Sequence, residues 1–171
     1  MTIPETIDRT LLQTYLSDHL TGATGGRARA LKMAEWYSDS DIGPDLARVA
    51  AELDAEQEHL KDLIDRLGLT QPLPKQLLAR VGELAGRLTA NGRVLTGSPM
   101  TPLLELELLR MAVNGKQGLW ETLTGYASEL GLDPERYRDL AEQARAQEQT
   151  LERLHGMVRP DALRPGPGTR G

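Results

Sequence analysis

Apolar residues recur every three or four positions along almost the whole chain, and no stretch alternates apolar and polar residues as a half-buried strand does. This spacing places the apolar side chains of each segment on one face of a helix. The pattern predicts an all-α protein with five helices, over about residues 7–37, 44–67, 75–91, 99–130 and 133–158.

The breaks between these segments carry residues that start and stop helices. Pro44 and Pro134 suit the first turn of a helix, because the N–H that proline lacks has no partner there. Asp133 is placed to cap the last helix. Gly68 and Gly131 suit the position that follows a helix C-terminus.

The apolar stripes indicate which residues face the core. In the second helix they are Leu46, Val49, Leu53, Leu60, Leu63 and Leu67, and in the last helix Tyr137, Leu140, Ala144, Leu151, Leu154 and Val158. The fourth helix is apolar on two sides. We expect Leu104, Leu108 and Met111 to face the bundle, which leaves a second apolar face made of Leu106, Leu109, Val113 and Trp120. Such a face must be covered, and a homodimer contact through it is predicted.

Length and composition indicate one soluble domain, residues 1–158, followed by a disordered Pro/Gly/Arg tail at 159–171. Cysteine is absent, which excludes disulfides and thiolate metal sites. No secretory h-region and no run of apolar residues long enough for a membrane span is present, so a cytoplasmic protein without a membrane partner is expected. The net charge of -5, with Arg interleaved among acids, argues against nucleic-acid binding.

Two motifs of one form, Glu56-x-x-His59 and Glu152-x-x-His155, pair an acid with a histidine three residues later, each within a predicted helix. Residues three apart lie on the same side of a helix, so two such helices facing each other could hold two metal ions. No phosphate-binding loop, serine-hydrolase elbow or zinc-protease motif accompanies them. Metal binding is therefore the chemistry that these motifs indicate.

Short turns join the first two long helices and the last two, which predicts two antiparallel hairpins. The long segment between the hairpins, with the short helix at 75–91, suffices to carry the chain from one end of the bundle to the other. This arrangement resembles the ferritin-like four-helix bundle over nearly the whole chain apart from the tail. In di-metal members of that superfamily, the first and third bundle helices each provide a Glu, and the second and fourth each provide Glu-x-x-His.

The resemblance implies an iron or manganese site, with candidate ligands Glu56, His59, Glu107, Glu148, Glu152 and His155. Glu107 is the third-helix candidate because counting from the turn near Gly131 places it level with His155. The first helix departs from the family pattern, since Ala23 and Gly26 stand where its carboxylate belongs. Glu56 and His155 also differ in depth by about six residues, or roughly 10 Å along a helix.

The same counting favours a second interpretation, a buried polar layer. It places Glu56, Gln57, Gln147 and Glu148 at one level, opposite Gly26 and Gly115. An inward glutamate needs a partner, and Arg27 or Arg145 is the cation that we expect to pair with it. We favour such an ion pair over metal ligation. His59 and Glu152 are then expected on the solvated flanks of their helices.

Small residues form a further stripe, which comprises Gly22, Ala23 and Gly26 on the first helix and Gly115 and Gly118 on the fourth. Glycine inside a helix costs up to about 1 kcal/mol relative to alanine, so several of them imply a steric reason. We expect close packing of two helices. A cavity for an apolar ligand is the alternative.

The function predicted from the sequence is that of a ferritin-like bundle that is non-catalytic and that self-associates or binds a ligand or partner. The alternative is a di-iron or di-manganese carboxylate oxidase or oxygenase, or a metal-binding protein, that uses the six candidate ligands. An apolar ligand held between the glycine stripes is a third hypothesis.

Overall fold

The computed structural model describes residues 2–71 and 98–164, and every regular element in this part of the chain is an α-helix. The helices are α1 (Arg9–Trp36), α2 (Gly43–Arg66), α4 (Thr101–Tyr126) and α5 (Pro134–Val158). The predicted all-α class is thus confirmed for these residues, and none of these helices has both the length and the apolar character that a membrane crossing requires. The short helix predicted at 75–91 lies outside the described residues.

The ends of the helices follow from capping chemistry. The Asp8 carboxylate accepts hydrogen bonds from two backbone amides of the first turn of α1, at 2.8 and 3.0 Å, so that helix begins at Arg9 rather than at residue 7. Asp133 caps α5 in the same way. Gly68 and Gly131 adopt φ values of 63° and 65°, a left-handed conformation that glycine adopts without strain, in the turns that follow α2 and α4.

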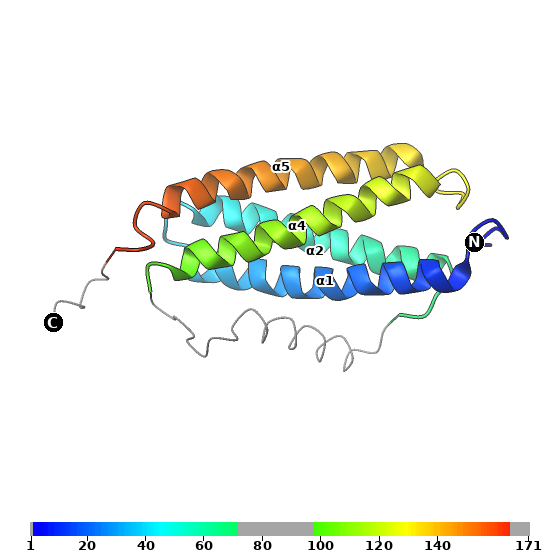
Figure 1. Ribbon diagram of the computed structural model, residues 1–171, viewed down its shortest axis with the longest axis horizontal. Coiled ribbons are helices and arrows are strands. Elements are labelled where there is room, and N and C mark those ends of the chain that lie inside the picture. Colours follow the sequence, from blue (N-terminus) through cyan, green and yellow to red (C-terminus); the bar gives the residue numbers. More distant parts are fainter. Residues whose placement is uncertain (1, 72–97, 165–171) are drawn as a thin grey trace.

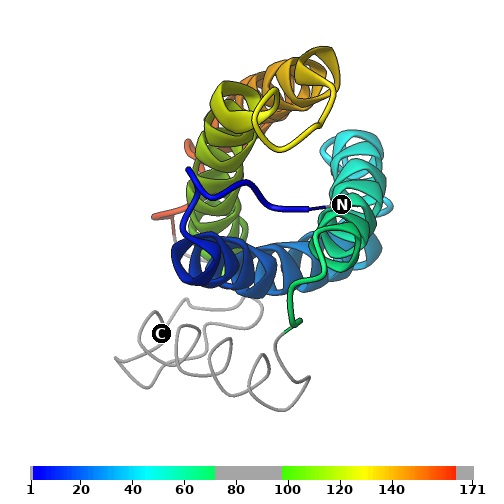
Figure 2. The same ribbon diagram turned by 90° about the vertical axis from the view of Figure 1, so that its right-hand side faces the viewer.

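The four helices lie roughly along one axis and surround a common core (Figures 1 and 2). In Figure 1, α1 and α2 lie side by side and run in opposite directions, and so do α4 and α5. Helix α1 also packs on α4, whereas α2 and α5 make the sparsest contact of the neighbouring pairs. Helix α2 ends and α4 begins at opposite ends of the bundle.

The apolar core is divided along the bundle axis into two clusters. One cluster includes Leu16, Leu20, Leu60, Leu63, Leu119, Trp120, Leu123, Tyr137, Leu140 and Ala144. The other includes Ala30, Met33, Leu46, Val49, Leu53, Leu106, Leu109, Val113, Leu151 and Leu154. All four helices contribute to both clusters, and the predicted inward stripe of α2 is buried along its whole length.

The predicted orientation of α4 is wrong. Leu106, Leu109, Val113 and Trp120, which we assigned to an outer homodimer face, are at most 1% exposed inside the bundle. Leu104 and Met111, which we assigned to the core, are 42% and 66% exposed. The buried stripe continues through Leu123 to Ala127, so it offers more apolar surface to the core than the stripe of Leu104 and Met111.

The beginning of the predicted disordered tail is packed onto the bundle. Arg159 to Arg164 form hydrogen-bonded turns, and Ala162 is only 3% exposed. The remainder of that predicted tail, 165–171, lies outside the described residues.

The orientation of α4 is tested by a pair of leucine substitutions. Leu109→Ala removes a fully buried side chain, and we expect it to lower the free energy of unfolding by about 2–5 kcal/mol. Leu104→Ala is the matched control on the exposed side, where a loss below about 1 kcal/mol is expected. Urea denaturation followed by circular dichroism measures both values, and a larger loss for Leu104→Ala would contradict this orientation.

Candidate functional site

A layer of polar side chains fills the gap between the two apolar clusters. Glu56 and Gln57 come from α2, Lys116 from α4 and Gln147 from α5. Glu56, Gln57 and Gln147 are 3%, 4% and 0% exposed, and the side chain of Lys116 is 10% exposed. Three of the four residues of the predicted polar layer are therefore buried, without Glu148, and the layer contains a cation that the sequence pattern did not point to.

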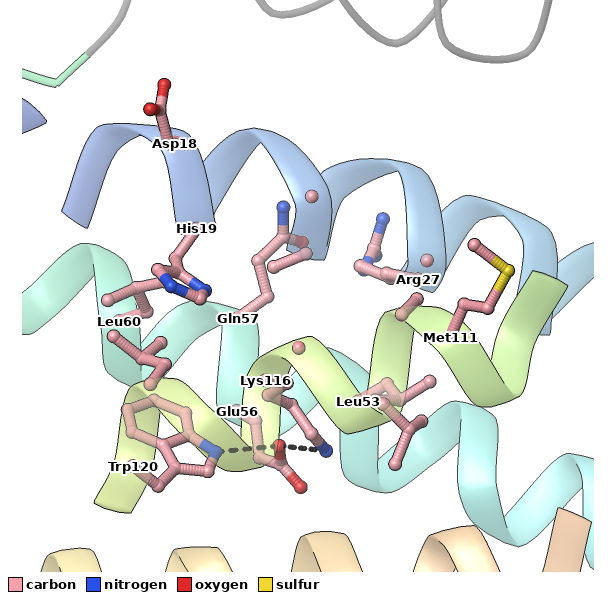
Figure 3. A pocket seen from close by; sticks show the side chains of 17 residues that line it. Asp18, His19, Arg27, Leu53, Glu56, Gln57, Leu60, Met111, Lys116 and Trp120 are labelled. Carbon is pink, nitrogen blue, oxygen red and sulfur yellow. Dashed lines mark hydrogen bonds and ion pairs between the residues drawn. The ribbon is translucent and has the colours of Figure 1, made fainter. Parts of the chain in front are cut away.

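Glu56 lies at the centre of this layer and has three polar partners. Its carboxylate forms an ion pair with the Lys116 ammonium group. Gln147 donates from Nε2 to Oε1 of Glu56 at 2.8 Å. Trp120 donates from its indole N–H to Oε2 at 3.4 Å (Figure 3). A buried carboxylate with these donors has its charge and its lone pairs satisfied without solvent.

The ammonium group of Lys116 is likewise enclosed by acceptors. It donates to Oε1 of Gln147 as well as to Glu56, and Gln147 in turn donates to Glu52 at 2.8 Å. Burial lowers the pKa of Lys116 from its usual value, and the nearby charges of Glu56 and Glu52 oppose that shift only in part. The layer thus holds an amine that gives up its proton more easily than a solvated lysine does.

The partner predicted for Glu56 is wrong. Arg27 pairs with Asp54, and Arg145 pairs with Glu121, both near the surface. Lys116 follows Val113 by three residues and precedes Trp120 by four, so it shares their helix face. Sequence reasoning missed Lys116 because it had assigned that face of α4 to the outside.

A cavity of about 260 Å³ adjoins the layer on the side of α1. Helices α1, α2 and α4 supply its walls, and Figure 3 shows His19 and Gln57 extending into the space between them. Its apolar lining comprises Ala23, Leu53, Leu60, Met111, Ala112, Val113, Leu119 and Trp120. Lys116 and Glu56 also line it, so the buried ion pair forms part of the cavity wall.

Three of the four glycines of the small-residue stripe border this cavity. The predicted close packing of helices is wrong for most of the stripe. A methyl group added at Gly22, Gly115 or Gly118 would have no atom within 4 Å. Only at Gly26 would it meet another helix, at 3.4 Å from the Cβ atom of Ala112. Gly22, Gly26 and Gly115 line the cavity, so the missing side chains create space rather than close contact.

The other candidate metal ligands lie apart from this layer. His155 and Glu107 do meet at the level predicted, with 3.2 Å between Nε2 and Oε1. Glu148 is held by Arg110, whose Nη2 lies 2.8 Å from its Oε1, and is not in the buried layer as predicted. Glu152 is 66% exposed, as expected, and lies 3.9 Å from the same guanidinium group.

His59 is not on a solvated flank as predicted. Its ring lies between Trp120 and Tyr137, with ring centroids 5.9 and 5.7 Å away. Its Nε2 atom is buried, and no hydrogen bond to it is present among the described residues. Burial, followed by the positive charges of Arg136 and Arg66, lowers the pKa of His59 and favours the neutral ring.

A second buried acid, Glu105 on α4, was not predicted as a buried residue. It is 5% exposed and accepts hydrogen bonds from Arg29 at 2.7 Å and from the Tyr37 hydroxyl at 3.0 Å. Burial, together with the charge of Glu105, raises the pKa of Tyr37 well above its usual value. This cluster closes the end of the core that lies far from Trp120.

The six candidate ligands thus fall into separate places rather than one site. Glu56 is in the polar layer, His59 is in the aromatic cluster, and the other four lie along α4 and α5. In the part of the chain that the structure describes, no group of three or more histidine and acidic side chains is arranged to hold a metal ion. Comparison of the chain with protein-family models, curated proteins and solved structures gives no match.

The ion pair is tested by removing its cation. Lys116→Met keeps a long apolar side chain but leaves Glu56 buried without a counter-charge, and we expect a loss of about 3–5 kcal/mol in the free energy of unfolding at pH 7. The double variant E56Q/K116M leaves no buried charge and is expected to recover part of that loss. Urea denaturation measures both.

Lys61→Met is the matched control for that substitution. Lys61 pairs with Glu58, whose side chain is 60% exposed, so its loss is expected to cost less than about 1 kcal/mol. Equal losses for Lys61→Met and Lys116→Met would show that the buried pair has no special role.

The neutral state of His59 predicts a pH dependence of stability. Its pKa is lower in the folded chain than the value of about 6.5 in the unfolded chain, so below that pH the unfolded chain binds a proton that the folded chain does not. The free energy of unfolding therefore falls as the pH drops below about 6.5, by at most about 1.4 kcal/mol per pH unit for one proton.

His59→Phe keeps a ring between Trp120 and Tyr137 but cannot bind the proton. We expect the stability of this variant to fall less than that of the wild type between pH 7.5 and pH 5.5, as measured by urea denaturation at each pH. Both proteins retain His19. Burial lowers the pKa of His19 as well, so its contribution to the pH dependence of stability is present in both proteins and cancels in the comparison. Identical pH profiles would contradict the prediction.

Proposed function

We propose that this chain is a ferritin-like four-helix bundle that binds a small apolar molecule in the cavity between α1, α2 and α4, and that it works as a non-catalytic binding protein in the cytoplasm. The single observation that supports binding is the cavity itself, about 260 Å³ in volume and bordered by three helical glycines. The two hairpins, with α2 and α4 connected from opposite ends of the bundle, support the ferritin-like arrangement.

The size of the cavity suits a ligand of one or two small rings. An apolar cavity of about 150 Å³ holds benzene, and ligand pockets range from about 300 Å³ upward, so this cavity lies between the two. Apolar side chains make up most of its walls. An apolar molecule would gain about 25 cal/mol for each Å² of surface that it buries there.

The glycines support a functional rather than a structural reason for the cavity. Alanine at Gly22 or Gly115 would meet no obstacle and would stabilise each helix by up to about 1 kcal/mol. The chain instead keeps glycine at both positions, beside a space that ordinary core side chains could fill. Ligand binding gives that space a use.

The alternative function, a di-iron or di-manganese centre, has one contact in its favour, that between Glu107 and His155. The remaining candidates are engaged by Lys116, by Arg110 or by aromatic rings. Metal content after purification with iron present tests this alternative. Self-association is also retained as a proposal, without the face that we had assigned to it, because those residues are in the core.

Toluene binding, followed by nuclear magnetic resonance, tests the proposed function. The chain has two tryptophans, and their indole N–H signals report on different places. Trp120 lines the cavity, whereas Trp36 is 50% exposed under Lys32. We expect the Trp120 signal to shift saturably with added toluene while the Trp36 signal stays in place.

A matched pair of glycine variants locates the binding. Gly115→Leu directs a side chain into open space beside the cavity and is expected to abolish the shift of the Trp120 signal. Gly125→Leu adds the same side chain to the same helix away from the cavity and should leave the shift unchanged. No shift in the wild type, or an equal shift in both variants, would overturn the proposal.

A further inference from the structure

We infer that the side-chain amine of Lys116 forms a reversible imine with a small apolar aldehyde that enters the cavity. This inference rests on the proposed function, since the aldehyde must first occupy the space between α1, α2 and α4. It goes beyond that function by assigning a covalent chemistry to one wall of the cavity.

The position of Lys116 carries the inference. Its side chain starts on α4 and extends to the Glu56 carboxylate, and both residues are part of the cavity lining (Figure 3). Only 10% of the Lys116 side chain is exposed, so an aldehyde would reach the amine through the cavity rather than from bulk solvent. Gln147 holds the other carboxylate oxygen, and Trp120 donates to the oxygen that Lys116 contacts, so the acid is fixed beside the amine.

Two properties of this environment favour attack on a carbonyl group. An amine must lose its proton before its lone pair can act, and burial lowers the pKa of Lys116. The Glu56 carboxylate is in contact with the ammonium group and can take that proton without a water molecule. Lys61 also contacts a carboxylate, at 2.7 Å from Glu58, but the side chains of this pair are 34% and 60% exposed, so solvent reaches both groups.

The step balances within the two side chains and the aldehyde. The Lys116 ammonium group passes a proton to Glu56, and the freed lone pair forms a C–N bond to the carbonyl carbon. The carbonyl oxygen takes up the proton to give a carbinolamine. Nitrogen then loses its second proton to Glu56, which passes it to the hydroxyl group. The hydroxyl group leaves as water, and a protonated C=N bond results beside the Glu56 carboxylate. No oxidant or reductant is required.

The lining restricts the aldehydes that fit. Leu53, Leu60 and Val113 suit an uncharged hydrocarbon body. Among the described residues of the lining, the cations of Arg27 and Lys116 are already paired with Asp54 and Glu56, so neither is left for a carboxylate or phosphate of the substrate. Benzaldehyde matches the cavity in size and polarity, given that an apolar cavity of about 150 Å³ holds benzene.

Reductive trapping tests the inference on the wild-type protein. The folded chain is incubated with benzaldehyde and sodium cyanoborohydride at pH 7, digested, and analysed by mass spectrometry for benzylated lysines. We expect Lys116 to be labelled severalfold faster than Lys61, since the cavity holds the aldehyde beside Lys116 and burial lowers the pKa of its amine. The excess should shrink as the pH is raised toward 10.

Two controls connect the labelling with the cavity. Saturating toluene, and separately the variant Gly115→Leu, should each slow the labelling of Lys116 at least fivefold and leave that of Lys61 unchanged. Gly125→Leu should behave as the wild type.

The outcomes separate the two proposals. Toluene binding with no preferential labelling of Lys116 overturns the imine and leaves the proposed function intact. Labelling of Lys116 only after unfolding in urea, or at the rate of Lys61, also overturns the imine. If toluene does not bind and Lys116 is not labelled in the folded chain, both proposals fall.

Discussion

A carboxylate and an ammonium group lie together in the middle of this bundle, and the surrounding structure is arranged to make that contact tolerable. Removing either charge from water costs several kcal/mol, so Glu56 and Lys116 need each other and further partners as well. Gln147 serves both ions, donating to Glu56 and accepting from Lys116. The indole N–H of Trp120 completes the set. Three helices must therefore be in register before any one of these groups is satisfied, which favours a single alignment of α2, α4 and α5 over shifted ones.

The same layer explains why the core is not continuous. Apolar clusters lie on either side of it. Helix α1 faces it with the Thr24 hydroxyl, which accepts a hydrogen bond from Gln57 at 2.7 Å, and otherwise with small residues such as Gly22, Ala23 and Gly26. Large apolar side chains from α1 would pack against charged groups at this level, and a charged one would need a partner of its own. Small residues avoid both costs but leave the space beside the ion pair unfilled. The cavity thus lies where glycine and alanine of α1 face the polar layer, and Lys116 is part of its wall.

Sequence periodicity predicted the four described helices to within a few residues, because capping residues such as Asp8 and Asp133 act locally. It also placed Glu56, Gln57 and Gln147 in one layer, since depth along antiparallel helices follows from counting residues from a turn. Counting gave the depth of Glu148 but not its direction, and that side chain pairs with Arg110 outside the layer. It could not orient α4, whose sequence offers two apolar faces, and the choice depends on how much surface the other helices cover. The sequence did not predict the partner of Glu56 for the same reason, because Lys116 lies on the face of α4 that was assigned to the outside.

The Glu-x-x-His motifs show how little spacing alone says about ligation. In each motif the two side chains are separated along the helix and turn to different neighbours: Glu56 meets Lys116, while His59 meets Trp120 and Tyr137. Here an ammonium group on a neighbouring helix supplies the positive charge. A divalent ion at the same carboxylate would have to displace Lys116 or endure its repulsion at close range in a medium of low dielectric constant, so the lysine both neutralises the acid and disfavours the metal.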